Sequence, residues 1–250
     1  MADATWFKIL VADESDAYQW KTAAALSEPG MPADSWIGNT CVMDRDHVAA
    51  VYAPRSFTNK PDLMQGGAFT AIINTSTGDV TKLPFTGTLA YFDPSCNTVT
   101  HTAAFTQYRE MNDASKLRTR VITVDMAGKT LYKSGELRGQ VSSPAPVNDG
   151  VVAGLGQDLV QVGKNGRIRK LAHGDSIPFD IRPMPGGKTS FMDRKGTTTG
   201  QAKVFTGTAN RKLWQPGRWQ TSTWSPVPRE ASSLPGTLAR TGREAAVSAG

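Results

Sequence analysis

Carboxylates are the residues of this chain that could most directly do chemistry. They include candidates in predicted strands or turns, such as Asp93, Asp125, Asp180 and Asp193. A ring of sheets could bring two such groups together in its central channel, where carboxyl groups about 5–9.5 Å apart hydrolyse glycosidic bonds. Nothing in the sequence shows that the groups converge. A carbohydrate-active enzyme with paired carboxylates is therefore the alternative interpretation, and no catalytic residue is assigned.

Other catalytic and metal-binding signatures are missing from the sequence. It contains no G-x-S-x-G elbow, no H-E-x-x-H motif, no Walker loop and no dinucleotide fingerprint. The three histidines, His47, His101 and His173, fall in different units without metal-ligand spacing. We therefore predict no metal site and no cofactor.

The segment 54–67, PRSFTNKPDLMQGG, is a long polar loop bounded by proline. Long loops on a rigid scaffold often carry binding groups. Arg55, Asn59 and Lys60 are accordingly the candidate ligand-binding residues. A simple solvated loop is the alternative.

The cysteines are Cys41 and Cys96, which follow short polar turns in GNTC and DPSC. Two cysteines exclude a Cys₄ metal site, and their similar surroundings predict equivalent positions in neighbouring units. A secreted protein would join them in a disulfide, whereas a cytosolic one would keep two buried thiols. Both outcomes stay open.

Repeated strand pairs around a glycine turn are the main structural pattern. Three clear copies span 71–83, 121–134 and 160–171, with turns at Gly78, Gly128 and Gly166, and a weaker copy spans 203–213. Another strand pair precedes each copy, at 41–53, 89–108, 145–157 and 179–194. Four strands every ~40–50 residues predict an all-β, β-propeller-like array of four-stranded antiparallel blades, incomplete in number. A β-sandwich is the competing fold.

The repeats divide the chain into three regions. Residues 1–35 form an N-terminal extension with a first strand and a short helical segment near 17–26, and residues 36–213 form the repeat domain. Trp6, Trp20 and Trp36 are expected to be packing aromatics. Residues 214–250 have three Trp and four Pro without strand alternation, which predicts a disordered tail. We hypothesise that this tail is a frameshift product, which the coding DNA would test.

The net charge of +6 comes from the end of the chain. Residues 1–194 hold 20 basic and 20 acidic side chains, and residues 195–250 hold eight basic and two acidic ones. A nucleic-acid-binding protein needs a basic face on its folded body, so this class is not favoured. The sequence contains no apolar run of 18 residues, so it predicts no membrane span. The first 15 residues do not resemble a signal peptide, so the chain taken literally would be cytoplasmic.

The runs DAYQWKTAAALSEPG, DSWIGNTCV, AAVYAPRSFTNKPDLMQGGAFTAIINTSTGDVTKLP and LAYFDPSC carry a family resemblance. They resemble the N-terminal propeller-like region of secreted actinobacterial proteins of the rearrangement-hotspot (RHS, YD-repeat), wall-associated type, over residues 4–213. The resemblance implies an extracellular or cell-surface location, and a parent protein with a signal peptide and C-terminal modules. It implies no catalytic residue.

The sequence as a whole predicts a non-catalytic structural or interaction module, a truncated remnant of a larger secreted or cell-surface protein. Its expected partners are a protein or cell-wall carbohydrate, and neither nucleic acid nor a membrane.

Overall fold

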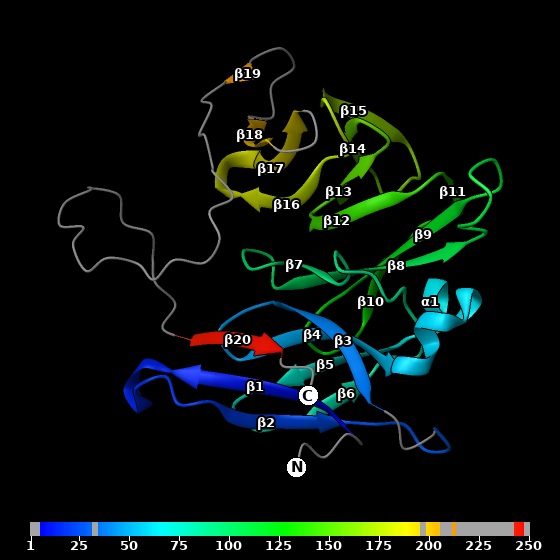
Figure 1. Cartoon of the computed structure of the whole chain (residues 1–250). Coiled ribbons are helices and arrows are strands. Elements are labelled where there is room, and N and C mark those ends of the chain that lie inside the picture. The colour runs from blue at the N-terminus through cyan, green and yellow to red at the C-terminus, as the bar shows by residue number, and fades with distance from the viewer. Residues whose placement is uncertain (1–5, 32–34, 196–198, 206–211, 214–242, 248–250) are drawn as a thin grey trace.

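The computed structural model describes residues 6–31, 35–195, 199–205, 212–213 and 243–247 (Figure 1). In this part of the chain, strands dominate and form five antiparallel sheets. We call the four-stranded or larger sheets blades 1 to 4, in chain order, and the remaining one the terminal sheet. The helical elements are short: η1 (Glu14–Asp16), η2 (Arg55–Asn59), α1 (Pro61–Gly66) and η3 (Pro185–Gly187).

Each sheet has the following strands. The terminal sheet contains β1 (Phe7–Asp13), β2 (Lys21–Leu26) and β20 (Arg243–Val247). Blade 1 contains β3 (Trp36–Val42), β4 (His47–Pro54), β5 (Phe69–Asn74) and β6 (Val80–Lys82). Blade 2 contains β7 (Ser95–Asn97), β8 (Thr102–Arg109), β9 (Arg118–Val124), β10 (Thr130–Lys133) and β11 (Leu137–Arg138). Blade 3 contains β12 (Val141–Val147), β13 (Gly150–Leu155), β14 (Asp158–Val162) and β15 (Ile168–His173). Blade 4 contains β16 (Phe179–Met184), β17 (Lys188–Lys195), β18 (Thr199–Phe205) and β19 (Lys212–Leu213).

The blades are built from consecutive strands and lie next to one another around an arc (Figure 1). The first strand of each blade contacts the first strand of the next, in the order β3, β7, β12 and β16. We call these four the inner strands. The predicted all-β, propeller-like fold is therefore confirmed, and the β-sandwich alternative is wrong.

The predicted glycine turns explain why the hairpins reverse where they do. Gly78, Gly128 and Gly166 have φ values of 81°, 78° and 76°. This left-handed region is open to glycine at little steric cost. The fourth predicted turn, at Gly207, lies outside the described residues.

Apolar side chains fill each junction between successive sheets. Tyr52 and Phe7 belong to the cluster between the terminal sheet and blade 1, and Phe105 belongs to the cluster between blades 1 and 2. Phe191 belongs to the cluster between blades 3 and 4. Burying one such aromatic side chain contributes about 1.5–3 kcal/mol. Neighbouring blades therefore stabilise one another through the faces that they cover.

The N-terminal region differs from its prediction. The expected helical segment near 17–26 is wrong, because η1 ends at Asp16 and Lys21–Leu26 is the strand β2. The alanine-rich sequence KTAAAL favours a helix by propensity. Its alternation, however, buries Ala24 and Leu26 on one side of a strand, against blade 1. Tertiary packing overrides intrinsic propensity here.

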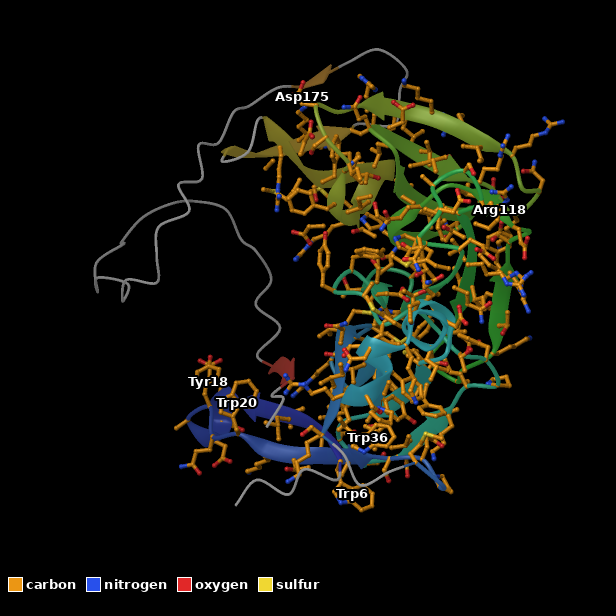
Figure 2. The ribbon with its side chains drawn as sticks, turned by 45° about the vertical axis from the view of Figure 1, so that its right-hand side comes forward. Trp6, Tyr18, Trp20, Trp36, Arg118 and Asp175 are labelled. Atoms are coloured by element: carbon orange, nitrogen blue, oxygen red, sulfur yellow. A yellow bond between two sulfur atoms is a disulfide. The ribbon has the colours of Figure 1, made fainter. Side chains whose placement is uncertain are left out.

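The tryptophans also divide differently from the prediction. Trp36 is buried and packs at 5.9 Å from Tyr52. Trp6 and Trp20 are 45% and 52% exposed, so they are not packing aromatics in the described part of the chain. Figure 2 shows Trp20 beside Tyr18 at one end of the β1–β2 hairpin.

The strand β20 pairs with β1, in a register that places Arg243 opposite Asp13 and Val247 opposite Ile9. The prediction of disorder therefore does not hold for residues 243–247. An open strand edge offers backbone hydrogen bonds to almost any sequence, so side-chain alternation is a poor guide to this pairing. Residues 214–242 and 248–250 lie outside the described residues, and the frameshift hypothesis stays a prediction.

Candidate functional site

The inner strands of all four blades contribute to one pocket of 790 Å³, which we call the inner pocket. Its wall includes hydroxyl groups from three of the four inner strands, namely Thr40 in β3, Ser95 in β7 and Ser143 in β12. Tyr91, 81% exposed, lies on its wall, edge-on to Phe92 at 5.1 Å. An exposed aromatic ring beside neutral hydroxyl groups can stack on a ligand and hydrogen-bond to it.

Two irregular inner strands shape this pocket. The register shifts between Ser142 and Ala145 in β12, and between Phe179 and Arg182 in β16. Within these bulges Ser143 has φ 47° and Asp180 has φ 48°. Both residues line the pocket. Bulges redirect side chains, and non-glycine residues with positive φ are often found at functional sites.

Asp180 is the only carboxylate on the wall of the inner pocket among the described residues. Its Oδ1 accepts a hydrogen bond of 2.9 Å from Nε of Arg182, which also lines the pocket. A carboxylate paired with arginine can orient a polar ligand. It does not by itself make the acid and base pair of a glycoside hydrolase.

Asp93 lies inside the pocket wall rather than on it. Its neighbours Phe92 and Pro94 line the pocket, but Asp93 itself has no exposed surface. Its carboxyl accepts hydrogen bonds from the backbone N–H of Thr106, 3.0 Å from each oxygen, and from the Thr106 hydroxyl at 3.2 Å. Burial raises the pKa of Asp93 well above its ordinary value, although the bonds from Thr106 oppose this effect.

The other two predicted carboxylates have local structural contacts. Asp125 accepts hydrogen bonds from the backbone N–H of Ala127 and Lys129 in the β9–β10 turn. Asp193 is fully buried in blade 4, where it accepts bonds from several donors and from Lys203. Neither lines the inner pocket, so the described structure does not bring the predicted carboxylates together there.

The histidines stay apart, each with its own partner. His47 contacts Asp44 at 2.9 Å, His101 contacts the carbonyl oxygen of Met43 at 3.3 Å, and His173 contacts a carboxylate in blade 3. Within the described ranges, no group of three or more His, Cys, Asp or Glu could hold a metal ion. No helix in those ranges is long and apolar enough to cross a bilayer.

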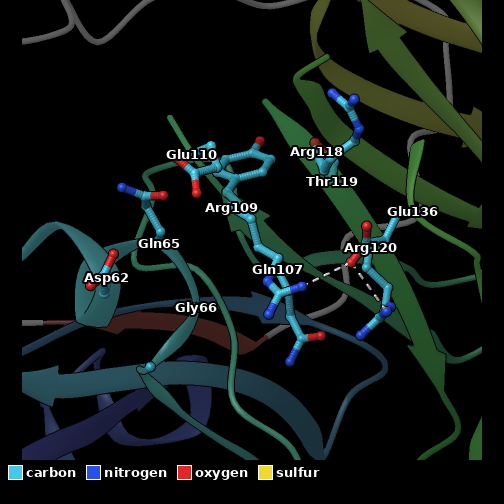
Figure 3. Close-up of a pocket in the computed structure, with 12 residues that line it drawn as sticks. Asp62, Gln65, Gly66, Gln107, Arg109, Glu110, Arg118, Thr119, Arg120 and Glu136 are labelled. Carbon is cyan, nitrogen blue, oxygen red and sulfur yellow. Dashed lines mark hydrogen bonds and ion pairs between the residues drawn. The ribbon is translucent and has the colours of Figure 1, made fainter. Parts of the chain in front are cut away.

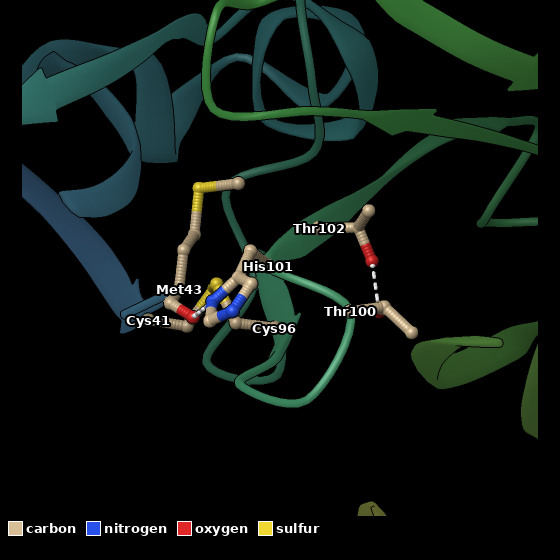
Figure 4. The surroundings of a disulfide bond; sticks show 6 residues. All are labelled: Cys41, Met43, Cys96, Thr100, His101 and Thr102. Carbon is tan, nitrogen blue, oxygen red and sulfur yellow. Dashed lines mark hydrogen bonds between the residues drawn. A yellow bond between two sulfur atoms is a disulfide. The ribbon is translucent and has the colours of Figure 1, made fainter. Parts of the chain in front are cut away.

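The cysteines form a disulfide that joins two inner strands (Figure 4). Cys41 lies in β3 and Cys96 in β7, with sulfur atoms 2.03 Å apart and Cα atoms 5.5 Å apart. Both cysteines occupy the first strand of their blade, and both line the inner pocket. The bond therefore fixes one part of the pocket wall covalently.

The predicted binding loop is partly helical, as η2 and α1. Arg55, Asn59 and Lys60 are exposed on it, and they line neither the inner pocket nor the second pocket described next. Phe57 is buried and anchors the loop in an apolar cluster. Only the later part of the loop reaches a cavity.

A second pocket, the interblade pocket, lies between α1 and the strands β8 and β9 (Figure 3). It has a volume of 810 Å³. Arg109 and Arg120 both reach one oxygen of Glu136, Oε1, at 3.1 Å and 3.6 Å. On the α1 side, Oε1 of the buried Gln65 accepts a 3.1 Å hydrogen bond from the backbone N–H of Met111.

Sequence patterns gave little sign of either pocket. The inner pocket depends on bulges, whose only sequence signal is proline, at Pro183 within a predicted strand pair and at Pro144 directly before one. The interblade pocket depends on the register of β8 and β9, which a single sequence does not reveal.

Comparison with known proteins leaves the family open. No protein-family model matches the chain, and no curated protein matches it. Among solved structures it is similar to one from the study "Structural and Mechanistic Analysis of Two Prolyl Endopeptidases: Role of Inter-Domain Dynamics in Catalysis and Specificity". The identity is 13% and the TM-score 0.35, over 82% of this chain and 39% of that one. The chain thus spans well under half the length of that protein.

Proposed function

We propose that this chain is a non-catalytic interaction module of a larger secreted or cell-surface protein, and that it binds its ligand in the inner pocket. The observation that carries the proposal is the pocket itself, which all four inner strands wall and which holds the exposed ring of Tyr91. Concave pockets with a few convergent polar groups are the usual form of ligand sites.

Binding fits this pocket better than hydrolysis. Asp180 is its one carboxylate among the described residues, and Arg182 already pairs with it. Asp93, the predicted carboxylate whose neighbours Phe92 and Pro94 line the pocket, has no exposed surface. A glycoside hydrolase needs two accessible carboxyl groups on either side of the bond that breaks.

The disulfide supports a location outside the cytoplasm. Disulfides persist in oxidising compartments and are rare in the cytosol. Cys41 and Cys96 join neighbouring blades, so the bond serves the fold rather than a transient reaction. The sequence resemblance to the secreted RHS, wall-associated proteins points to the same location.

Cell-wall carbohydrate is the ligand that best suits the lining. Sugar rings stack on aromatic faces, and sugar hydroxyls exchange hydrogen bonds with side chains such as Ser95, Ser143 and Ser190. A single charged pair, Asp180 with Arg182, contributes no net charge. A neutral polyhydroxylated ligand matches this balance.

Co-sedimentation with purified cell-wall polysaccharide tests the proposal. Tyr91→Ala should weaken binding about two- to tenfold, because stacking on one aromatic ring contributes about 0.5–1.5 kcal/mol. Tyr18→Ala is the matched control, since Tyr18 is also an exposed tyrosine but lines neither pocket. Binding that resists Tyr91→Ala, or that Tyr18→Ala weakens equally, would contradict the proposed site.

A second measurement separates binding from catalysis. The same polysaccharide is incubated with the protein, and soluble reducing ends are counted. The proposal expects none above the level of a heat-inactivated sample. Release of sugar that Asp180→Asn abolishes would establish the carbohydrate-active alternative instead.

A further inference from the structure

The interblade pocket carries an unusual set of charges on blade 2. In the pairing of β8 with β9, Arg109 stands opposite Arg118 and Gln107 stands opposite Arg120. Side chains alternate along a strand, so these four residues share one face of the sheet. Like charges directly opposite each other destabilise a sheet. The fold itself therefore gives no reason for this arrangement.

The carboxylate of this wall pairs with only two of its three arginines. Glu136 accepts a hydrogen bond from Arg109 and forms an ion pair with Arg120 through the same oxygen. The guanidinium of Arg118 donates instead to the backbone carbonyls of Leu117, at 2.9 Å, and Ser115, at 3.3 Å. These carbonyls are neutral. The blade 2 wall therefore keeps an excess of positive charge.

The other side of the pocket is acidic. Asp62 lies on α1, across the pocket from Arg120 and Glu136 in Figure 3, and Glu110 follows the end of β8. Both are exposed, and neither makes an ion pair within the part of the chain that the structure describes. Gly66 and Gly67 complete this side with bare backbone.

We propose that the interblade pocket binds a zwitterionic ligand of short-peptide size. Its carboxylate lies against Arg118 and Arg120, and its ammonium group lies against Asp62 and Glu110. Guanidinium groups bind carboxylates through two parallel hydrogen bonds, and charge-assisted bonds are the stronger ones. The 810 Å³ volume accommodates a short peptide with both ends inside. This proposal does not depend on carbohydrate binding in the inner pocket.

Four forms of one probe test the two ends separately. Tetra-alanine with free ends, its N-acetyl form, its C-terminal amide and the doubly blocked form are titrated into the full chain and followed by NMR. Blocking either end should weaken binding about tenfold, since a hydrogen bond to a charged group contributes about 1.5–3 kcal/mol. Equal affinity for the free and the doubly blocked peptide, or no binding of any form, would overturn the proposal.

Variants then assign each end of the peptide to a wall. Asp62→Asn should remove the preference for a free N-terminus and leave the preference for a free C-terminus. Arg118→Gln should do the reverse. Arg167→Gln is the control, because Arg167 is an exposed arginine that lines neither pocket. If both wall variants lose both preferences together, or neither loses any, the assignment is wrong.

The inner-pocket variant keeps the two sites distinguishable. Tyr91→Ala should bind tetra-alanine as the unchanged chain does, because Tyr91 does not line the interblade pocket. Loss of peptide binding in Tyr91→Ala would place the peptide in the inner pocket and overturn this proposal.

Discussion

Blades 2 and 4 each enclose an aspartate without exposed surface, but the pKa values of the two carboxyl groups shift in opposite directions. Among the described residues, Thr106 is the only donor to the carboxyl of Asp93 in blade 2, and burial raises the pKa of Asp93. Burial would also raise the pKa of Asp193 in blade 4. Hydrogen bonds from Lys203, and from the backbone N–H groups of Asp175 and Ser176, outweigh it and lower the pKa.

The difference shows what decides the charge of a buried carboxyl group. Removal from water disfavours the ionised form in both places. Asp193 stays ionised because a cation and several N–H and O–H donors surround it, including the Ser176 hydroxyl at 2.9 Å. Asp93 is favoured in its neutral form because one threonine does not replace the lost water. Burial alone therefore does not identify a functional acid.

Removal of the disulfide should cause the largest loss of unfolding free energy. The loss should act on the blade 2 side. Cys96 lies three residues after Asp93, and its bond to Cys41 closes a loop with a sequence separation of 55. The variant Cys41→Ala with Cys96→Ala should lose about 4 kcal/mol of unfolding free energy, since the unfolded chain is no longer constrained. Chemical denaturation measures this loss.

Hydrogen exchange locates the effect of the missing disulfide. Protection should fall in β3 and β7 and persist in blade 4. The unchanged chain under reducing conditions is the control and should behave alike. A loss of protection in blade 4 that exceeds the loss in β3 and β7 would contradict this expectation.

Loss of the charge on Asp193 in blade 4 should cause the next largest loss of unfolding free energy. Asp193→Asn should cost about 2–3 kcal/mol at pH 7, because bonds to a charged group are replaced by weaker ones. The folded-state pKa of Asp193 is lowered, so its contribution is present above the ordinary pKa of about 3.9 and is lost as the pH falls through the folded-state value. The difference in unfolding free energy between Asp193→Asn and the unchanged chain should therefore shrink at acidic pH.

Asp175→Asn is the matched control for Asp193. Asp175 also reaches Lys203, at 3.5 Å, but its side chain is 52% exposed. Exposed pairs contribute little, so its unfolding free energy should change by less than about 1 kcal/mol. An equal loss from both variants would show that Lys203, and not burial with multiple donors, sets the state of Asp193.

The smallest change in unfolding free energy should come from a substitution of Asp93, and it should be a gain rather than a loss. As the pH rises past about 3.9, the unfolded chain releases this proton while the folded chain keeps it, so stability falls with rising pH. Asp93→Asn removes this loss and should gain on the order of 1 kcal/mol at pH 7. The gain should vanish near pH 3. A gain or loss that does not depend on pH would contradict the raised pKa.

The fold was predictable because its signals are local. Gly78, Gly128 and Gly166 mark turns whose geometry favours glycine, and each blade uses consecutive strands, so turn chemistry and alternation were enough to identify the array. The prediction failed at β2, where Ala24 and Leu26 pack on a neighbouring sheet. A short stretch of sequence does not show which residues, distant in the chain, it packs against.

The pockets were less predictable for the same reason. The candidates Arg55, Asn59 and Lys60 line neither pocket, whereas Asp62, from the same loop, lines the interblade pocket. The inner pocket needs positive φ at Ser143 and Asp180, where local sequence disfavours it. The packing of the four blades against one another determines these backbone conformations.

The pairing of β1 with β20 has a consequence for how the chain is made on the ribosome. Every blade joins strands close in sequence, so each can form soon after its residues leave the exit tunnel. By contrast, Ile9 meets Val247 only after all four blades between them have been made. Until then one edge of β1 has no neighbour, and during those seconds the nascent chain is most open to pairing with another molecule.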